Sequence, residues 1–72
     1  MTRQELSRAA TQAGVNKESF GENMNLARRF LRSGKKEESS QCALKAIKLH
    51  ADWPHLFSHI NDKTLNIAKE MI

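Results

Sequence analysis

The stretch "LARRFLRSGKKEESSQCALKAIKLHAD", residues 26–52, predicts two helices that pack side by side across one turn at Gly34. Glycine ends helices readily because it adopts the left-handed backbone conformation without a steric penalty. The preceding helix carries an apolar stripe at helical spacing, formed by Phe20, Met24, Ala27 and Leu31 and widened by Leu26 and Phe30. The following helix begins near Lys36 and has an inner face of mostly small residues, Ser39, Cys42, Ala43, Ala46, Ile47 and Leu49. Small side chains let two helices approach closely, so we expect a tight antiparallel helical hairpin.

Signals on either side of this hairpin predict two further helices. Thr2 and Glu5 form the pattern of a capping box, and Gly14 supplies the stop of a short first helix. Asn16 is a preferred N-cap residue for the hairpin's first helix. After the hairpin, residues 52–54 read as the start of a single fourth helix that continues to Met71, with a break at residues 61–62 left open. No segment alternates like a strand, so we predict one all-α domain over residues 1–72, a small bundle of about four helices.

The positive charge of the chain lies in its middle third. The 72 residues carry a formal net charge of +4, and residues 27–48 alone hold seven basic and two acidic groups. Such a local field attracts anionic partners without identifying them. No apolar run approaches the ~20 residues that span a bilayer, and no secretory leader pattern is present. We therefore expect a cytoplasmic protein that does not enter a membrane.

Residues 26–52 also resemble one tetratricopeptide repeat. Six residues stand where such a repeat places its packing residues and its turn: Leu26, Phe30, Gly34, Ala43, Ala46 and Leu49. The resemblance implies a protein-binding module. A solenoid needs about three repeats, more than this chain can hold. An unrelated helical hairpin that reaches the same packing therefore stays open as an alternative.

A second stretch, "LSRAATQAGVNKESF" at residues 6–20, resembles a DNA-binding helix-turn-helix. Ala10 stands at the small position of the first helix and Gly14 in the turn, while Val15 and Phe20 stand at packing positions of the second helix. The resemblance implies a transcriptional regulator. The residues that would contact DNA are Asn16, Lys17 and Ser19. Glu18 and Glu22 would face the same groove and be repelled by phosphate, so DNA binding is our alternative prediction.

The first prediction is a non-enzymatic regulator or adaptor that docks another protein with an acidic surface. The predicted partner-binding residues are Arg28, Arg29, Arg32, Lys35, Lys36, Leu44, Lys45, Lys48 and Trp53. The basic residues among them are expected to share one side of the hairpin, Leu44 to point outward, and Trp53 either to anchor the fourth helix or to contact the partner. A homodimer that completes the thin core of so short a chain is a third interpretation.

Neither catalysis nor a metal site is predicted. His55 and His59 are four residues apart, a spacing that brings two imidazoles together on one helix face, but no third ligand stands at a suitable spacing. Cys42 falls on the inner face of its helix, where we expect a buried structural thiol. The chain has no glycine-rich phosphate loop and no paired-carboxylate motif, so we expect no enzyme activity and no cofactor.

Overall fold

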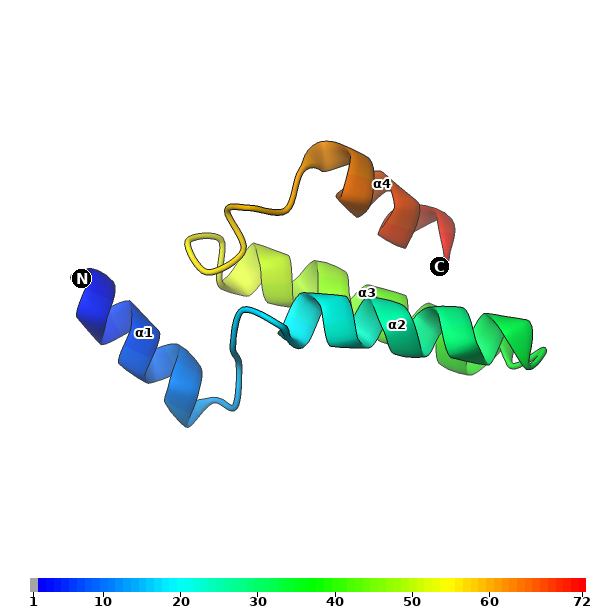
Figure 1. Cartoon of the computed structure of the whole chain (residues 1–72), viewed down its shortest axis with the longest axis horizontal. Helices are drawn as coiled ribbons and strands as arrows, with labels where there is room; N and C mark the ends of the chain where they lie inside the picture. Colours follow the sequence, from blue (N-terminus) through cyan, green and yellow to red (C-terminus); the bar gives the residue numbers. More distant parts are fainter. Residues whose placement is uncertain (1) are drawn as a thin grey trace.

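The computed structural model describes residues 2–72, and within them it contains four helices and no strand (Figure 1). The helices are α1 (Arg3–Gln12), α2 (Ser19–Arg32), α3 (Lys36–Asp52) and α4 (Asp62–Glu70). The all-α prediction is therefore correct. The molecule measures 42 × 23 × 14 Å, and its radius of gyration of 12.8 Å exceeds the about 11 Å expected of a compact chain of this length. The excess arises because α1 extends away from the other helices (Figure 1).

Local hydrogen bonds explain where α1 and α2 begin or end. The Glu5 backbone N–H donates to the Thr2 hydroxyl, and the Thr2 N–H donates to the Glu5 carboxylate, so the predicted capping box is present. Both predicted glycine stops are also present, with φ of 75° at Gly14 and 76° at Gly34. Beyond Gly14, the Val15 N–H donates to the Ala10 carbonyl at 2.8 Å. This is the Schellman arrangement, which satisfies carbonyls that the helix leaves unpaired.

Small buried residues bring α2 and α3 together. The two helices lie side by side, and the chain turns back between them at residues 33–35 (Figure 1). Ala27 of α2 and Ala43 and Ala46 of α3 are fully buried. Ser39 is also fully buried, and its hydroxyl donates to the Ala27 carbonyl at 2.7 Å. A buried hydroxyl without an acceptor would cost free energy, so this bond lets a polar side chain occupy the contact between the helices.

The core lies at the end of the pair opposite this turn. Its buried members come from α2, α3, the turns after α3, and α4, and they are Phe20, Met24, Ala46, Phe57 and Ala68. The rings of Phe20 and Phe57 are 6.1 Å apart between centroids, and the ring of His50 lies 6.3 Å from that of Phe20. Only one residue of α1, Ala10, is buried. The first helix is therefore held by far less apolar contact than the others.

Two predicted helix boundaries are wrong. Asn16 does not cap α2, because its side chain instead accepts from the Glu18 N–H in a turn, and α2 begins at Ser19. The expected continuous fourth helix is also absent. Asp52 is the last residue of α3, and residues 54–59 form turns that deliver Phe57 to the core. Phe57 and Ala68 are both fully buried, although only Ala68 lies in a helix.

The short fourth helix leaves part of the hydrophobic stripe of α2 uncovered. At 1.5 Å per residue, the nine residues of α4 reach about 14 Å, whereas the 17 residues of α3 reach about 26 Å. The turn between α2 and α3 extends beyond the end of α4 (Figure 1). Leu31 lies near that turn and is 50% exposed, although its spacing predicted a core position. α4 is too short to reach this turn, and α1 extends away from the pair (Figure 1).

The cap at the start of α4 allows a test of where this helix begins. The Asn61 side-chain oxygen accepts from the Thr64 backbone N–H at 2.9 Å. Asn61→Ala should therefore lower the free energy of unfolding by about 1 kcal/mol, measured by urea denaturation. Asn66→Ala, at an exposed position within α4, is the matched control and should be neutral or slightly stabilising because alanine favours helices. Equal losses in both variants would contradict a helix start at Asn61.

None of the helices in residues 2–72 has the combination of length and apolar character that crossing a membrane requires.

Candidate functional site

The predicted basic stretch surrounds the turn between α2 and α3. Two hydrogen bonds close this turn, from the Lys35 N–H to the Phe30 carbonyl at 2.8 Å and from the Gly34 N–H to the Leu31 carbonyl at 3.1 Å. With the backbone polar groups satisfied internally, the cationic side chains are free to face solvent. All five of them are exposed: Arg28, Arg29, Arg32, Lys35 and Lys36. We call residues 27–36 the basic end.

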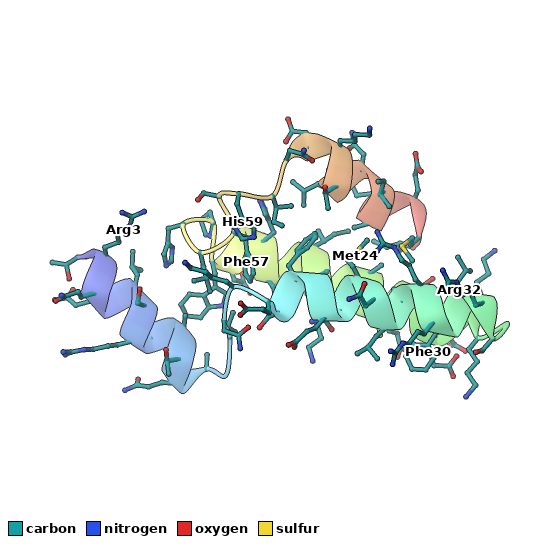
Figure 2. The ribbon with its side chains drawn as sticks, viewed as in Figure 1. Arg3, Met24, Phe30, Arg32, Phe57 and His59 are labelled. Carbon is teal, nitrogen blue, oxygen red and sulfur yellow. The ribbon has the colours of Figure 1, made fainter. Side chains whose placement is uncertain are left out.

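One side of the α2–α3 pair is covered by α4 and the other is not. The Ser40 hydroxyl of α3 donates to the Met71 carbonyl at 3.2 Å, which places α4 on the Ser40 side. Phe30 lies on the opposite side of the pair from α4 (Figure 2). Helical spacing places Leu26 beside Phe30, and places Cys42 and Leu49 on the side of α3 away from Ser40. We call these four residues, Leu26, Phe30, Cys42 and Leu49, the open face.

The open face is apolar and only partly covered. Leu26 is 42% exposed, and the other three residues are half-buried, with Leu49 also packing against the core. Leu26 also lines a groove of about 340 Å³ on the outer surface of α2, together with Glu22, Asn25 and Arg29. The Lys35 ammonium lies 6.0 Å from the centre of the Phe30 ring, at the outer limit of a cation–π interaction. Apolar surface is thus placed directly beside positive charge.

The seven basic residues predicted to bind a partner do not share one side of the pair. Arg29 lies in the groove beside Leu26, and Lys45 falls between Cys42 and Leu49 in helical spacing, so both border the open face. Arg32, by contrast, lies on the side of α4 (Figure 2). Arg28 follows Met24 by four residues, so it lies on the same side of α2 as Met24, which is the side of α4. The positive charge therefore surrounds the basic end and reaches the open face through two residues.

The two apolar residues predicted to contact a partner have different environments. Leu44 is 41% exposed, as expected, but it follows Ser40 by one turn and therefore lies on the side of α4. Trp53 is half-buried, packs against the core, and places its ring edge-on to that of His55 at 6.3 Å. Trp53 thus packs on the core at the start of the turns after α3. The fourth helix that it was predicted to anchor does not begin there, and its contact with a partner stays a prediction.

The residues predicted to contact DNA are largely engaged within the protein. Ser19 is only 8% exposed, and its hydroxyl donates to the Asn16 side-chain oxygen at 3.3 Å. The Ser19 side chain also accepts from the Asn16 backbone N–H at 2.9 Å. Expecting Ser19 to face a groove was wrong, because it closes the turn before α2. Of the three residues, Lys17 keeps an exposed side chain without such a bond.

The histidines and the cysteine also differ from their predicted settings. His55 and His59 lie in the turns between α3 and α4, so the spacing of a helix does not bring them together. His55 is half-buried, whereas His59 is exposed. Within residues 2–72, His, Cys, Asp and Glu side chains form no group of three or more able to hold a metal. Cys42 is a free, half-buried thiol on the open face, not the fully buried one expected.

From the sequence we predicted that all four residues of the open face would face the core. Leu26 and Phe30 flank the central stripe of α2, and such flanking positions are buried only if a further helix covers them. Their position at the edge of the stripe was the sequence signal for exposure. The sequence did not show how long α4 is or on which side of the pair it packs.

Comparison of the chain with models of protein families, with curated proteins and with solved structures yields no match.

Proposed function

We propose that this protein is a small non-enzymatic binding module, and that its open face receives an acidic amphipathic helix of a partner protein. The observation that carries this proposal is the position of exposed Leu26 and half-buried Phe30 next to exposed cations, on the side of the pair that α4 does not cover. A partner helix can lay its ridges of side chains against α2 and α3 on this face, and on the opposite side α4 packs against α3.

The charge around the open face favours an acidic partner. Arg29 and Lys45 border the open face from its two helices, and the basic end adds further cations at one end of this face. Charge of this kind raises association rates and sets orientation, whereas the buried apolar contacts supply most of the affinity. Glu22, which shares the groove with Leu26, would oppose a carboxylate at that point. A partner helix with leucine-like residues at helical spacing and carboxylates toward the basic end fits this arrangement.

The proposal is tested by affinity capture from a lysate of the source cells, with and without nuclease. Leu26→Asp and the double variant Arg29→Glu/Lys45→Glu should each lose the proteins that the unaltered chain captures after nuclease treatment. Lys63→Glu/Lys69→Glu reverses two charges on exposed positions of α4 and is the matched control, which should keep them. The altered chains are first checked for helix content by circular dichroism.

Two results would reject this function. Folded open-face variants that retain the same proteins would show that another surface binds them. Loss of all captured material after nuclease would instead favour the helix-turn-helix alternative, in which Asn16, Lys17 and Ser19 face DNA. That alternative is less favoured because Ser19 is buried and Glu18 and Glu22 are exposed beside Lys17. A homodimer formed through the open face would appear as a doubled mass in sedimentation of the purified chain, and Leu26→Asp would abolish it.

A further inference from the structure

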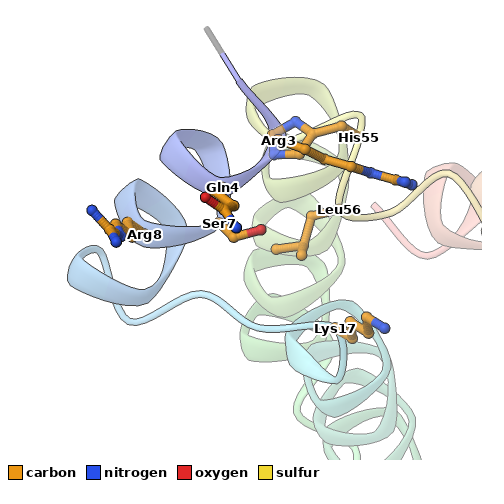
Figure 3. A pocket seen from close by; sticks show the side chains of 7 residues that line it. All are labelled: Arg3, Gln4, Ser7, Arg8, Lys17, His55 and Leu56. Atoms are coloured by element: carbon orange, nitrogen blue, oxygen red, sulfur yellow. The ribbon is translucent and has the colours of Figure 1, made fainter.

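A pocket of about 680 Å³ lies between α1 and the turns that follow α3 (Figure 3). It is separate from the open face and is built from three parts of the chain that are distant in sequence. Arg3 and Arg8 come from α1, Lys17 from the segment before α2, and His55 and Leu56 from the turns after α3. Its volume falls within the range of small-molecule sites, about 300–1,000 Å³.

The lining is positively charged and contains no carboxylate. Three of its seven residues are cationic, and the others are neutral polar or apolar residues and His55. Glu5, the acidic residue of α1, has its carboxylate engaged by the Thr2 backbone N–H at the start of the helix. The first turn of α1 also contributes Arg3 to the pocket, so the positive end of the helix dipole lies at its edge. A concave surface with charge of one sign concentrates ions of the opposite sign.

His55 supplies a second, independent indication of a ligand. Its Nε2 atom is buried and has no hydrogen-bond partner within the protein. Buried polar atoms in folded proteins nearly always have a partner, so an unpaired one requires an explanation. Arg3 lines the same pocket as His55 (Figure 3), and it is an exposed residue at the start of a helix. Because His55 lines the pocket, a ligand oxygen that reached Nε2 would supply the partner that this atom lacks.

We propose that this pocket binds a phosphate monoester of a small organic molecule. A phosphate group carries up to two negative charges and several acceptor oxygens, which matches several cations and a hydrogen-bonding imidazole. The pocket is larger than a phosphate ion needs, and Leu56 offers apolar surface to the organic part. An extended nucleic-acid strand fits less well because Glu18 and Glu22, exposed beyond Lys17, would meet its next phosphates.

Binding would also fasten α1 to the rest of the molecule. Because Ala10 is the one buried residue of α1, this helix should open locally with little cost in free energy. A ligand held by Arg3 and Arg8 on one side and by Lys17 and His55 on the other would join the two parts. Amide hydrogen exchange in α1 should therefore slow when the ligand is present. A diffuse cloud of anions around exposed cations would not produce that protection.

The test is a titration of the full chain with adenosine monophosphate, followed by ¹H–¹⁵N NMR at constant ionic strength. Adenosine and inorganic phosphate serve as separate ligands. Adenosine monophosphate should shift the amides of Arg3, Lys17 and Leu56 and the His55 Nε2 resonance, and slow exchange in α1. Arg8→Gln/Lys17→Gln should weaken binding by at least about tenfold. Arg29→Gln/Lys45→Gln, which removes two cations elsewhere, should leave binding unchanged.

Each of the other outcomes overturns the inference. Inorganic phosphate binding as tightly as adenosine monophosphate would mean a simple anion site. Adenosine binding equally well would remove the role of the phosphate, and equal weakening in both double variants would indicate general charge attraction. Binding of duplex DNA without binding of adenosine monophosphate would assign this surface to nucleic acid. The open-face variants do not alter this pocket, so the two proposals fail independently.

Discussion

Phe57→Ala should lower the free energy of unfolding by about 3–5 kcal/mol, the range observed when a buried aromatic side chain is removed from a core. Phe57 is fully buried and joins Phe20 and Met24 of α2, Ala46 of α3 and Ala68 of α4 in one cluster. A domain of 72 residues has a total stability of only about 4–11 kcal/mol, so the loss would remove much of it. The expected fall in melting temperature is at least about 12 °C.

Urea denaturation followed by circular dichroism measures this change. Phe30→Ala removes the same side chain from the half-exposed open face and is the matched control, with an expected loss less than half as large. If Phe57→Ala is too unstable to show a folded baseline, Phe57→Leu keeps most of the apolar volume and should cost about 1 kcal/mol. Equal losses for Phe57→Ala and Phe30→Ala would contradict the position of the core.

Ala43→Leu should destabilise the protein by about 1–3 kcal/mol, even though it adds apolar surface. Ala43 is fully buried on the side of α3 that meets α2, and a leucine there would force the two helices apart. That separation would also stretch the hydrogen bond from the Ser39 hydroxyl to the Ala27 carbonyl, which is 2.7 Å long. Thermal unfolding measures the loss, because a lower melting temperature is expected despite leucine's good helix propensity.

The neighbouring position supplies the control for this prediction. Leu44→Ala makes the reverse change one residue later, where the side chain is 41% exposed, and should shift stability by less than about 1 kcal/mol. A stabilising effect of Ala43→Leu would show that α2 and α3 leave room between them. The contrast between two adjacent residues thus tests the close approach of these helices directly.

Much of the secondary structure follows from local signals in the sequence. Gly14 and Gly34 end their helices because each adopts a positive φ that other residues reach only with strain. Thr2 and Glu5 start α1 through bonds that span three residues. The all-α class follows from the apolar periodicity and the absence of strand alternation. These features depend on neighbours in sequence, so the tertiary fold is not needed to read them.

The fourth helix shows where periodicity alone misleads. Phe57 and Ala68 are eleven residues apart, close to three helical turns, and both are fully buried. The segment that carries Phe57 is nevertheless a series of turns, and a helix begins only after Asn61 caps it. Pro54 and the polar residues around 61 are compatible with either a helix start or a turn. The segment forms turns because the chain must bend there to bring Phe57 against Phe20.

The candidate sites depend still more on tertiary structure. The exposed basic residues of residues 27–36 were evident from the sequence, because charged side chains are rarely buried without a partner. The open face was not evident from the sequence, because Leu26 and Phe30 look like core residues until the length and side of α4 are known. The pocket at His55 was equally hidden, since Arg3 and His55 are 52 positions apart in sequence.

The sequence by itself determined the all-α class, the C-terminal ends of α1 and α2, and the basic charge around Gly34. Each of these is set by a residue and its neighbours within about one helical turn. Tertiary structure alone decided which apolar residues are covered and which cations share a surface. Covering a side chain requires another element to reach it, and here α4 packs on one side of the α2–α3 pair and is too short to reach the turn between them. The uncovered side is where we expect a partner to bind.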